Sequence, residues 1–171
     1  LVPEADTSTP GSIVSEKLPT LKSLILIGDE SLDGFFNYSQ VQSMGEKSDL
    51  DLSEIADRID ADDAVNIQFT SGTTGSPKGA TLTHNNIVNN AYFIARGLKM
   101  TPQDKVCSPV PLYHCFGMVL AVLACATAGA TVVLPDESFD PLSTLEAVEA
   151  EKCTALYGVP TMFNMVLDHP Q

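Results

Sequence analysis

One stretch of ten residues, 70–79, gathers the groups best suited to bind phosphate. It holds several hydroxyl side chains, three glycines and one lysine, and it follows the strand-like residues 65–69. Glycine lets a backbone approach a ligand closely, hydroxyl and backbone N–H groups donate hydrogen bonds to phosphate oxygens, and lysine adds positive charge. The stretch therefore predicts a polyphosphate-binding loop. Its predicted binding residues are Thr70, Ser71, Gly72, Thr73, Thr74, Gly75 and Lys78.

The loop differs from the P-loop of many ATPases. In that motif a Gly-Lys pair precedes Ser or Thr at the start of a helix, whereas Lys78 lies between Pro77 and Gly79. The next residues, 80–83 (Ala-Thr-Leu-Thr), are typical of a second strand. The sequence therefore predicts a strand–loop–strand hairpin. The alternative is a flexible turn without a ligand, which would need neither the hydroxyls nor the lysine.

Residues 70–79 resemble, at essentially every position, the signature loop of the adenylate-forming (AMP-binding) acyl-CoA synthetase superfamily. Residues 111–117 (Pro-Leu-Tyr-His-Cys-Phe-Gly) are similar to its next motif, and residues 157–161 (Tyr-Gly-Val-Pro-Thr) resemble the turn that follows. The resemblance covers the chain from about Leu21 onward. It implies that the loop holds ATP phosphates and that His114, Phe116 and Gly117 line the acyl-substrate pocket. Judged without the resemblance, His114 is equally well a core or capping histidine.

The resemblance also implies a fold, a reaction and ligands. The expected fold is α/β, with a mostly parallel sheet flanked by helices, and residues 1–171 are expected to form a single partial domain, an internal piece of the large N-terminal domain. The expected reaction activates a carboxylic acid, in particular a fatty acid, as an acyl-adenylate and transfers it to CoA. ATP, Mg²⁺ and CoA are the implied cofactors and co-substrates.

Other segments of such enzymes have no counterpart in the sequence: the adenine-binding segment, the ribose-binding aspartate, the hinge and the C-terminal lysine. Gly158 is followed by Val159, Pro160 and Thr161 without a glutamate, so we assign no metal ligand and no catalytic residue. We expect the C-terminal domain to be absent and the piece to be inactive alone.

Three other functions stay open. One is an adenylation domain of another branch, of the peptide-synthetase or coumarate-CoA ligase type; the first is disfavoured because residues 113–116 lack an acidic partner for a substrate amine. Another is a phosphate-transferring ATPase, which would release ADP instead of AMP. The last is a non-catalytic scaffold or interaction module.

Composition restricts the possible partners. The chain has 22 acidic and 9 basic residues and a net charge of −13, which argues against a nucleic-acid surface. Its longest apolar run, residues 118–126, is too short to span a bilayer. The four cysteines lack zinc-type spacing and lie in apolar sequence, which predicts buried thiols in the cytoplasm or another reducing compartment. The acidic residues between 46 and 63 do not match a calcium loop and predict a solvated helix and linker. The oligomeric state is left open.

Strand and helix signals alternate along the chain. Strands are predicted over residues 21–27, 65–70, 79–82, 105–108, 130–134 and 154–157. Helices are predicted over residues 38–44, 50–59, 84–97, 113–128, 141–148 and 160–167. Ligands gather at the carboxyl ends of parallel strands, so the loop after Phe69, His114 and Gly158 are predicted to meet at one sheet edge.

Overall fold

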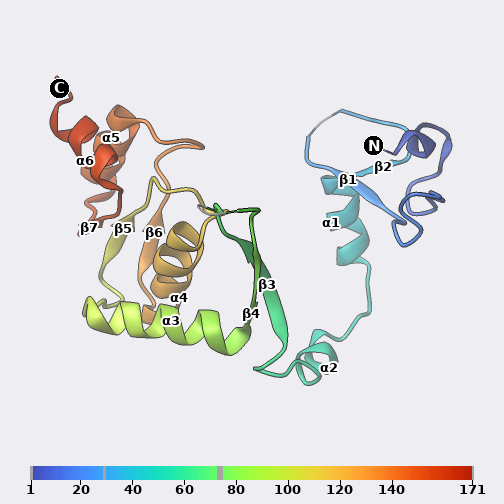
Figure 1. The fold of residues 1–171 in the computed structure, drawn as a ribbon, viewed down its shortest axis with the longest axis horizontal. Coiled ribbons are helices and arrows are strands. Elements are labelled where there is room, and N and C mark those ends of the chain that lie inside the picture. The colour runs from blue at the N-terminus through green and yellow to red at the C-terminus, as the bar shows by residue number, and fades with distance from the viewer. Residues whose placement is uncertain (1, 29, 73–74, 171) are drawn as a thin grey trace. The chain divides into compact units, whose positions relative to one another are not determined.

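The computed structural model describes residues 2–28, 30–72 and 75–170. The chain forms two compact units, Leu1–Asp57 and Arg58–Gln171, which are described separately (Figure 1). The first unit consists of short elements: η1 (Pro3–Thr7), β1 (Leu24–Leu26), β2 (Phe35–Asn37), α1 (Tyr38–Glu46) and α2 (Leu52–Ala56).

In the first unit β1 and β2 pair in parallel. Gly34 precedes β2 with a φ of +76°, and a Cβ at this position would overlap the Ala5 carbonyl oxygen, so glycine is required where the chain passes η1. Asn37 begins α1 with a capping box, in which the Asn37 N–H donates to Gln40 Oε1 at 2.9 Å. Strand β2 was not predicted, because three residues among turn signals are too few to show an alternation.

The second unit contains the alternating strands and helices. They are β3 (Ala64–Phe69), β4 (Gly79–Thr83), α3 (His84–Gly97), β5 (Lys105–Cys107), η2 (Phe116–Leu123), α4 (Ala124–Ala128), β6 (Thr131–Val133), α5 (Pro141–Glu151), β7 (Ala155–Leu156) and α6 (Pro160–Leu167).

A parallel sheet in the order β6-β5-β7 forms the centre of the second unit, with Val106 opposite both Val132 and Ala155. The helices η2 and α4 connect β5 to β6, and α5 connects β6 to β7. Because these two crossovers run in opposite directions across the sheet, right-handed connections place their helices on opposite faces. The predicted α/β fold, with parallel strands flanked by helices, is confirmed.

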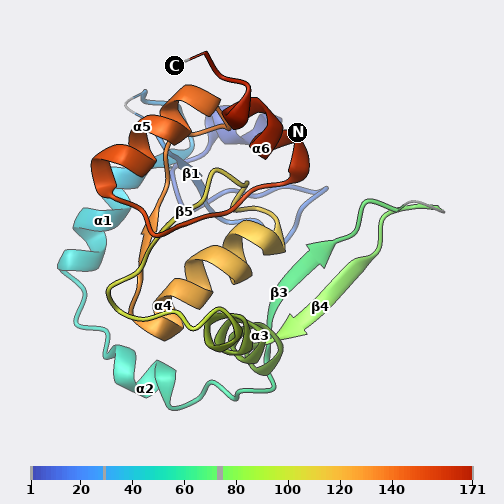
Figure 2. The same ribbon diagram turned by 90° about the vertical axis from the view of Figure 1, so that its left-hand side faces the viewer.

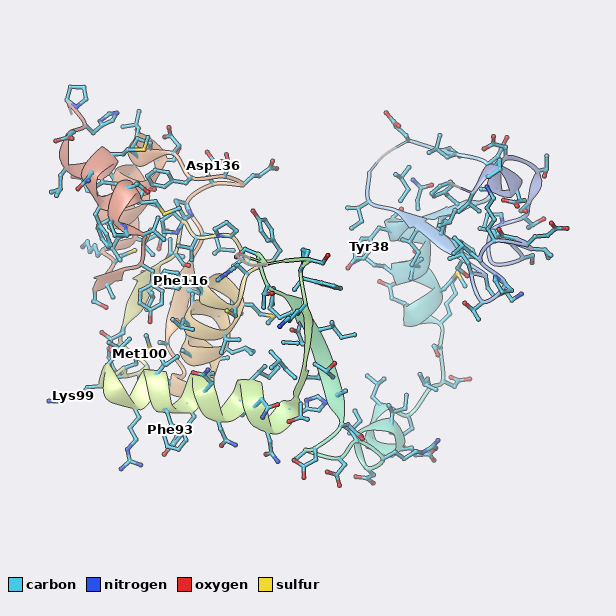
Figure 3. All side chains as sticks on the ribbon, viewed as in Figure 1. Tyr38, Phe93, Lys99, Met100, Phe116 and Asp136 are labelled. Carbon is cyan, nitrogen blue, oxygen red and sulfur yellow. The ribbon has the colours of Figure 1, made fainter. Side chains whose placement is uncertain are left out.

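Small side chains form the core between α3 and the η2–α4 helix. Ala91 and Ala95 on α3 pack against Val119 and Ala124. Small residues at these positions let the helix backbones approach closely. On the opposite side of α3, the Phe93 ring points away from the sheet (Figure 3).

Two predicted helices are shorter in the structure. The helix predicted over 113–128 begins at Phe116, and η2 has π-type hydrogen bonding before α4 continues it. Helix α2 ends at Ala56, and aspartates beyond the predicted helix bond to nearby backbone N–H groups. Asp63 Oδ2 accepts from the Asp60 N–H and Asp60 Oδ1 accepts from the Asp62 N–H, each at 2.8 Å.

The strands β3 and β4 form a separate antiparallel hairpin that projects from the rest of the second unit (Figure 2). The predicted strand–loop–strand arrangement is confirmed. The prediction that the loop lies at the edge of the parallel sheet is wrong, because β3 pairs only with β4 in the described part of the chain.

The hairpin has an unusual distribution of apolar and polar side chains. Val65, Ile67 and Phe69 alternate along β3 and are 44%, 61% and 67% exposed; we call them the outer face of the hairpin. Asn66 and Gln68 point the other way and are half-buried. The polar side of β3 therefore faces the rest of the unit. Among the described helices, none is both long and apolar enough to cross a bilayer.

Candidate functional site

The phosphate loop connects β3 to β4 and is closed mainly by its own backbone. The Thr70 N–H donates to the Lys78 carbonyl oxygen at 2.9 Å, and the Lys78 N–H donates to Thr70 Oγ1 at 3.2 Å. Within the loop, the Gly75 N–H donates to the Gly72 carbonyl oxygen at 3.3 Å. Gly72 has a φ of +64°, and a Cβ there would lie 2.6 Å from the Gly75 carbonyl oxygen. This closure therefore depends on glycine at position 72.

The polar groups of the loop are suited to an anionic ligand. Ser71 and Lys78 are exposed, and Lys78 forms no ion pair with a described carboxylate. Its ammonium is therefore free to contact a phosphate, although the net charge of −13 repels anions at longer range. Thr73 and Thr74 lie outside the described residues. No three described His, Cys, Asp or Glu residues are grouped so that they could hold a metal ion.

The second predicted motif forms a tight turn at the start of η2. The His114 N–H donates to the Pro111 carbonyl oxygen at 3.3 Å, and His114 Nδ1 accepts from the Phe116 N–H at 3.1 Å. Because Nδ1 is an acceptor, the neutral imidazole carries its proton on Nε2. The side chain is exposed. His114 thus caps the helix through one ring nitrogen and leaves the other as a donor for a ligand.

Gly117 is buried beneath this turn and does not line an open pocket. A Cβ at position 117 would overlap the Pro111 carbonyl oxygen. The next N–H, of Met118, donates to the His114 carbonyl oxygen at 3.0 Å. Gly117 therefore lets the turn pack directly on the helix that follows it, so its role in the structure is to support His114.

The phosphate loop and the His114 turn line one hollow of about 690 Å³. Its walls are residues 67–71 from the hairpin and residues 113–115 from the turn. A hydrogen bond crosses between the two walls: Gln68 Nε2 donates to the Tyr113 carbonyl oxygen at 3.1 Å. Two motifs that lie far apart in sequence are thus brought together. The sequence predicts this meeting at the edge of the parallel sheet, whereas the structure achieves it with a separate hairpin.

Phe116 and Gly158 do not line this hollow. The Phe116 ring packs on the Tyr157 ring, with centroids 5.6 Å apart. Burial raises the pKa of Tyr157, and its hydroxyl has no hydrogen-bond partner among the described residues. Gly158 packs against Phe163, where a Cβ would lie 3.3 Å from the ring. The prediction that all three motifs meet is therefore confirmed only for the first two.

A second hollow, of about 650 Å³, lies at the carboxyl ends of β5 and β6. Its walls are mostly apolar and include Val110, Leu134 and Met162, with Asp136 and Glu137 among its polar lining residues. Tyr113 lines both hollows. Ser108, fully buried in the wall, has an Oγ without a hydrogen-bond partner in the described structure.

The cysteines differ in their surroundings. Cys107 and Cys125 are buried as predicted, and burial raises the pKa of Cys107 to about 11. The prediction of a buried thiol is wrong for Cys115 and Cys153, which are both half-buried. Cys115 lines the first hollow, and its Sγ lies 3.8 Å from His114 Nδ1. Gln68 was also missed as a site residue, although a polar residue inside an apolar strand was a visible signal.

Family comparison agrees with the two motifs. Residues 4–171 match the model of the AMP-binding enzyme family. The chain belongs to this family. It is 43% identical over 172 residues to the mitochondrial medium-chain acyl-CoA ligase ACSF2 of zebrafish (Danio rerio), covering 99% of this chain and 28% of that protein.

Solved structures of relatives have the same fold. ATP-bound MatB from Rhodopseudomonas palustris aligns with a TM-score of 0.60 and 35% identity, over 65% of this chain and 22% of that one. The o-succinylbenzoate CoA synthetase of Bacillus subtilis, in complex with its acyl-adenylate intermediate, aligns with a TM-score of 0.61 and 26% identity, over 90% and 41%. The chain spans about 30% of the length of the curated relatives.

Proposed function

We propose that the protein containing this AMP-binding chain is an ATP-dependent acid–thiol ligase. A carboxylate oxygen attacks the α-phosphorus of ATP and pyrophosphate leaves, which gives an acyl-adenylate. The sulfur of CoA then attacks the acyl carbonyl, and AMP leaves as the thioester forms. The observation that carries this proposal is the shared hollow, because it sets phosphate-binding groups beside the turn assigned to the acid.

In this proposal the loop binds the β- and γ-phosphates and stabilises the charge that grows on the leaving pyrophosphate. The exposed Ser71 and Lys78 supply a donor and a positive charge, and Thr73 and Thr74 are proposed as further donors. Removing one fixed donor to developing charge typically costs about 3 kcal/mol of transition-state stabilisation. Mg²⁺ would be carried by the ATP phosphates. His114 would donate from Nε2 toward the carboxylate or the adenylate.

For the acid we propose a monocarboxylic acid with an apolar tail. The second hollow supports this choice, because its walls are mostly apolar and its described lining residues include no lysine, arginine or histidine. Asp136 and Glu137 would repel a second carboxylate on the substrate. The name of the zebrafish relative, a medium-chain acyl-CoA ligase, points to the same class of acid.

The experiment is pyrophosphate exchange into ATP by the full-length protein, with saturated monocarboxylic acids of increasing length and a dicarboxylic acid as comparison. We expect exchange with the apolar acids and little with the dicarboxylic acid. Lys78→Ala should lower the rate about 100-fold, with Lys99→Ala, at an exposed position just after α3, as the matched control. Release of ADP would instead indicate an ATPase, and no exchange with any acid would indicate a scaffold.

Three further assignments belong to the same proposal. Residues 1–171 are one part of a single AMP-binding domain, which the family match across both units supports. The chain alone is inactive, which the same pyrophosphate-exchange assay on the isolated chain can test; calorimetric titration of magnesium pyrophosphate and ATP into it tests whether the loop nevertheless binds them. We place the protein in the cytoplasm; the zebrafish relative is named mitochondrial, so imaging of the tagged full-length protein distinguishes the two compartments.

A further inference from the structure

Gln68 is the residue of β3 that connects the hairpin to the His114 turn. Its Nε2 donates to the Tyr113 carbonyl oxygen at 3.1 Å, across 45 positions of sequence. Thr70, which closes the phosphate loop, follows two residues later, and His114 is adjacent to Tyr113. One side-chain hydrogen bond therefore joins the base of the loop to the turn.

The strand is oriented so that Gln68 can make this contact. On β3 the apolar outer face is exposed, whereas Gln68 is on the half-buried side. Its cross-strand neighbour is Ala80, whose small side chain leaves room beside it. Exposing the apolar side chains of Ile67 and Phe69 to water is unfavourable. Contacts on the Gln68 side of β3 must therefore hold the strand in this orientation.

The acceptor side of the bond is equally well fixed. Tyr113 lies inside the turn that the His114 N–H closes onto the Pro111 carbonyl oxygen. Gly117 packs beneath the same oxygen, and the Phe116 N–H is bound by the His114 ring. A movement of the Tyr113 carbonyl would therefore move His114 with it.

We propose that Gln68 is a positioning residue that sets the distance between the phosphate loop and the His114 turn. This inference rests on the proposed function. In the first half-reaction, ATP and the acid are separate molecules, and the acid must meet the α-phosphate in the right geometry. Small displacements of two bound reactants lower such a rate strongly. In the second half-reaction acyl group and AMP are already joined, so the distance between loop and turn matters less.

The test uses Gln68→Leu, which keeps a side chain of similar size and removes the donor. In the full-length protein we expect pyrophosphate exchange with an apolar acid to fall about 10-fold. Thioester formation from a supplied acyl-adenylate should stay within about two-fold of the wild type. The matched control is Gln103→Leu, the same change at an exposed position between α3 and β5. Equal loss in both half-reactions, or no loss, would overturn the proposal.

A second measurement needs no activity. Hydrogen exchange of the peptide covering residues 112–118, followed by mass spectrometry, reports directly on the turn. In the Gln68→Leu variant, amide exchange in this peptide should be about 10-fold faster than in the wild type. In the Gln103→Leu variant it should stay at the wild-type rate. Unchanged exchange in the Gln68 variant would refute the connection whatever the protein's activity. If the wild type does not exchange pyrophosphate into ATP but amide exchange is faster in the Gln68 variant, the proposed function is refuted and the structural connection made by Gln68 is not.

Discussion

The phosphate loop and the His114 turn line the same hollow, yet they are held in place by different interactions. The loop is closed by hydrogen bonds between its own residues, Thr70 with Lys78 and Gly72 with Gly75. The turn also has local hydrogen bonds but is packed as well, because Gly117 is buried against it and Val119 belongs to the core. One wall of the hollow is thus local and the other is part of the packed unit, which predicts that substitutions in the two walls affect different properties.

The largest effect is expected in the packed wall. Gly117→Ala would place a methyl group onto the Pro111 carbonyl oxygen, so the turn or the start of η2 must move. We expect a loss of about 3 kcal/mol in the free energy of unfolding, measured by urea denaturation. Gly45→Ala, where a Cβ meets nothing within 4 Å, is the matched control. If Gly117→Ala costs no more unfolding free energy than Gly45→Ala, the turn is not held by packing.

Thiol labelling can compare the outer and inner sides of the same wall. Cys115 faces the hollow, whereas Cys107 is buried and its pKa is raised from 9.0 to about 11. At pH 8 the raised pKa lowers the thiolate fraction of Cys107 by about 100-fold relative to an ordinary cysteine, and burial also keeps the reagent away from it, so iodoacetamide should modify Cys115 well before Cys107. Peptide mass spectrometry gives the two rates. Equal rates would mean that the core beneath the turn opens readily.

The raised pKa of Cys107 also predicts a dependence of stability on alkaline pH. The protonated Cys107 thiol contributes to the free energy of unfolding fully below the unfolded pKa of 9.0, and this contribution is lost as pH rises through about 11. Thermal unfolding midpoints between pH 8 and 11 measure this loss. Cys107→Ala should flatten the curve in that range, and an unchanged slope would assign the loss to other groups.

A smaller effect is expected at the helix that connects β6 to β7. Asp140 Oδ2 accepts from the Ser143 N–H at 2.7 Å at the start of α5, and this bond holds the pKa of Asp140 below its usual value. Because the folded pKa is lowered, the stabilisation is present at neutral pH and is lost as pH falls through that pKa. Asp140→Ala should therefore lower the unfolding midpoint at pH 7 less than Gly117→Ala does, and the difference from wild type should shrink in acid. A difference that persists there would exclude the carboxylate as its cause.

The smallest effect on stability is expected in the local wall. Thr70→Val removes the hydroxyl that accepts from the Lys78 N–H, and water can replace it because both residues are exposed. We expect at most about 0.5 kcal/mol in unfolding free energy. Proteolysis within the loop should nevertheless become faster. A large shift of the unfolding midpoint would mean that the loop is coupled to the core.

This difference between the walls also explains what the sequence could predict. The hairpin and the loop were predictable because their signals are local: glycines, hydroxyls and a lysine lie in one stretch between two strands. The alternating strands and helices of the parallel sheet were predictable from apolar periodicity. The positions of Gln68, Phe116 and Cys115 were not, because they depend on which segments meet across long separations. Helix η2 begins later than predicted because His114 and Pro111 use backbone groups that a regular first turn would need.

The outer face of the hairpin has a consequence for the behaviour of this chain in solution. Val65, Ile67 and Phe69 are exposed on a strand that pairs only with β4 in the described structure. An apolar face beside open backbone edges is a template on which other chains can add strands. Concentrated preparations of the chain alone should therefore scatter light increasingly with time, and a lysine in place of Ile67 should delay this. The hairpin that presents the binding loop thus also limits the concentration at which the isolated chain stays dispersed.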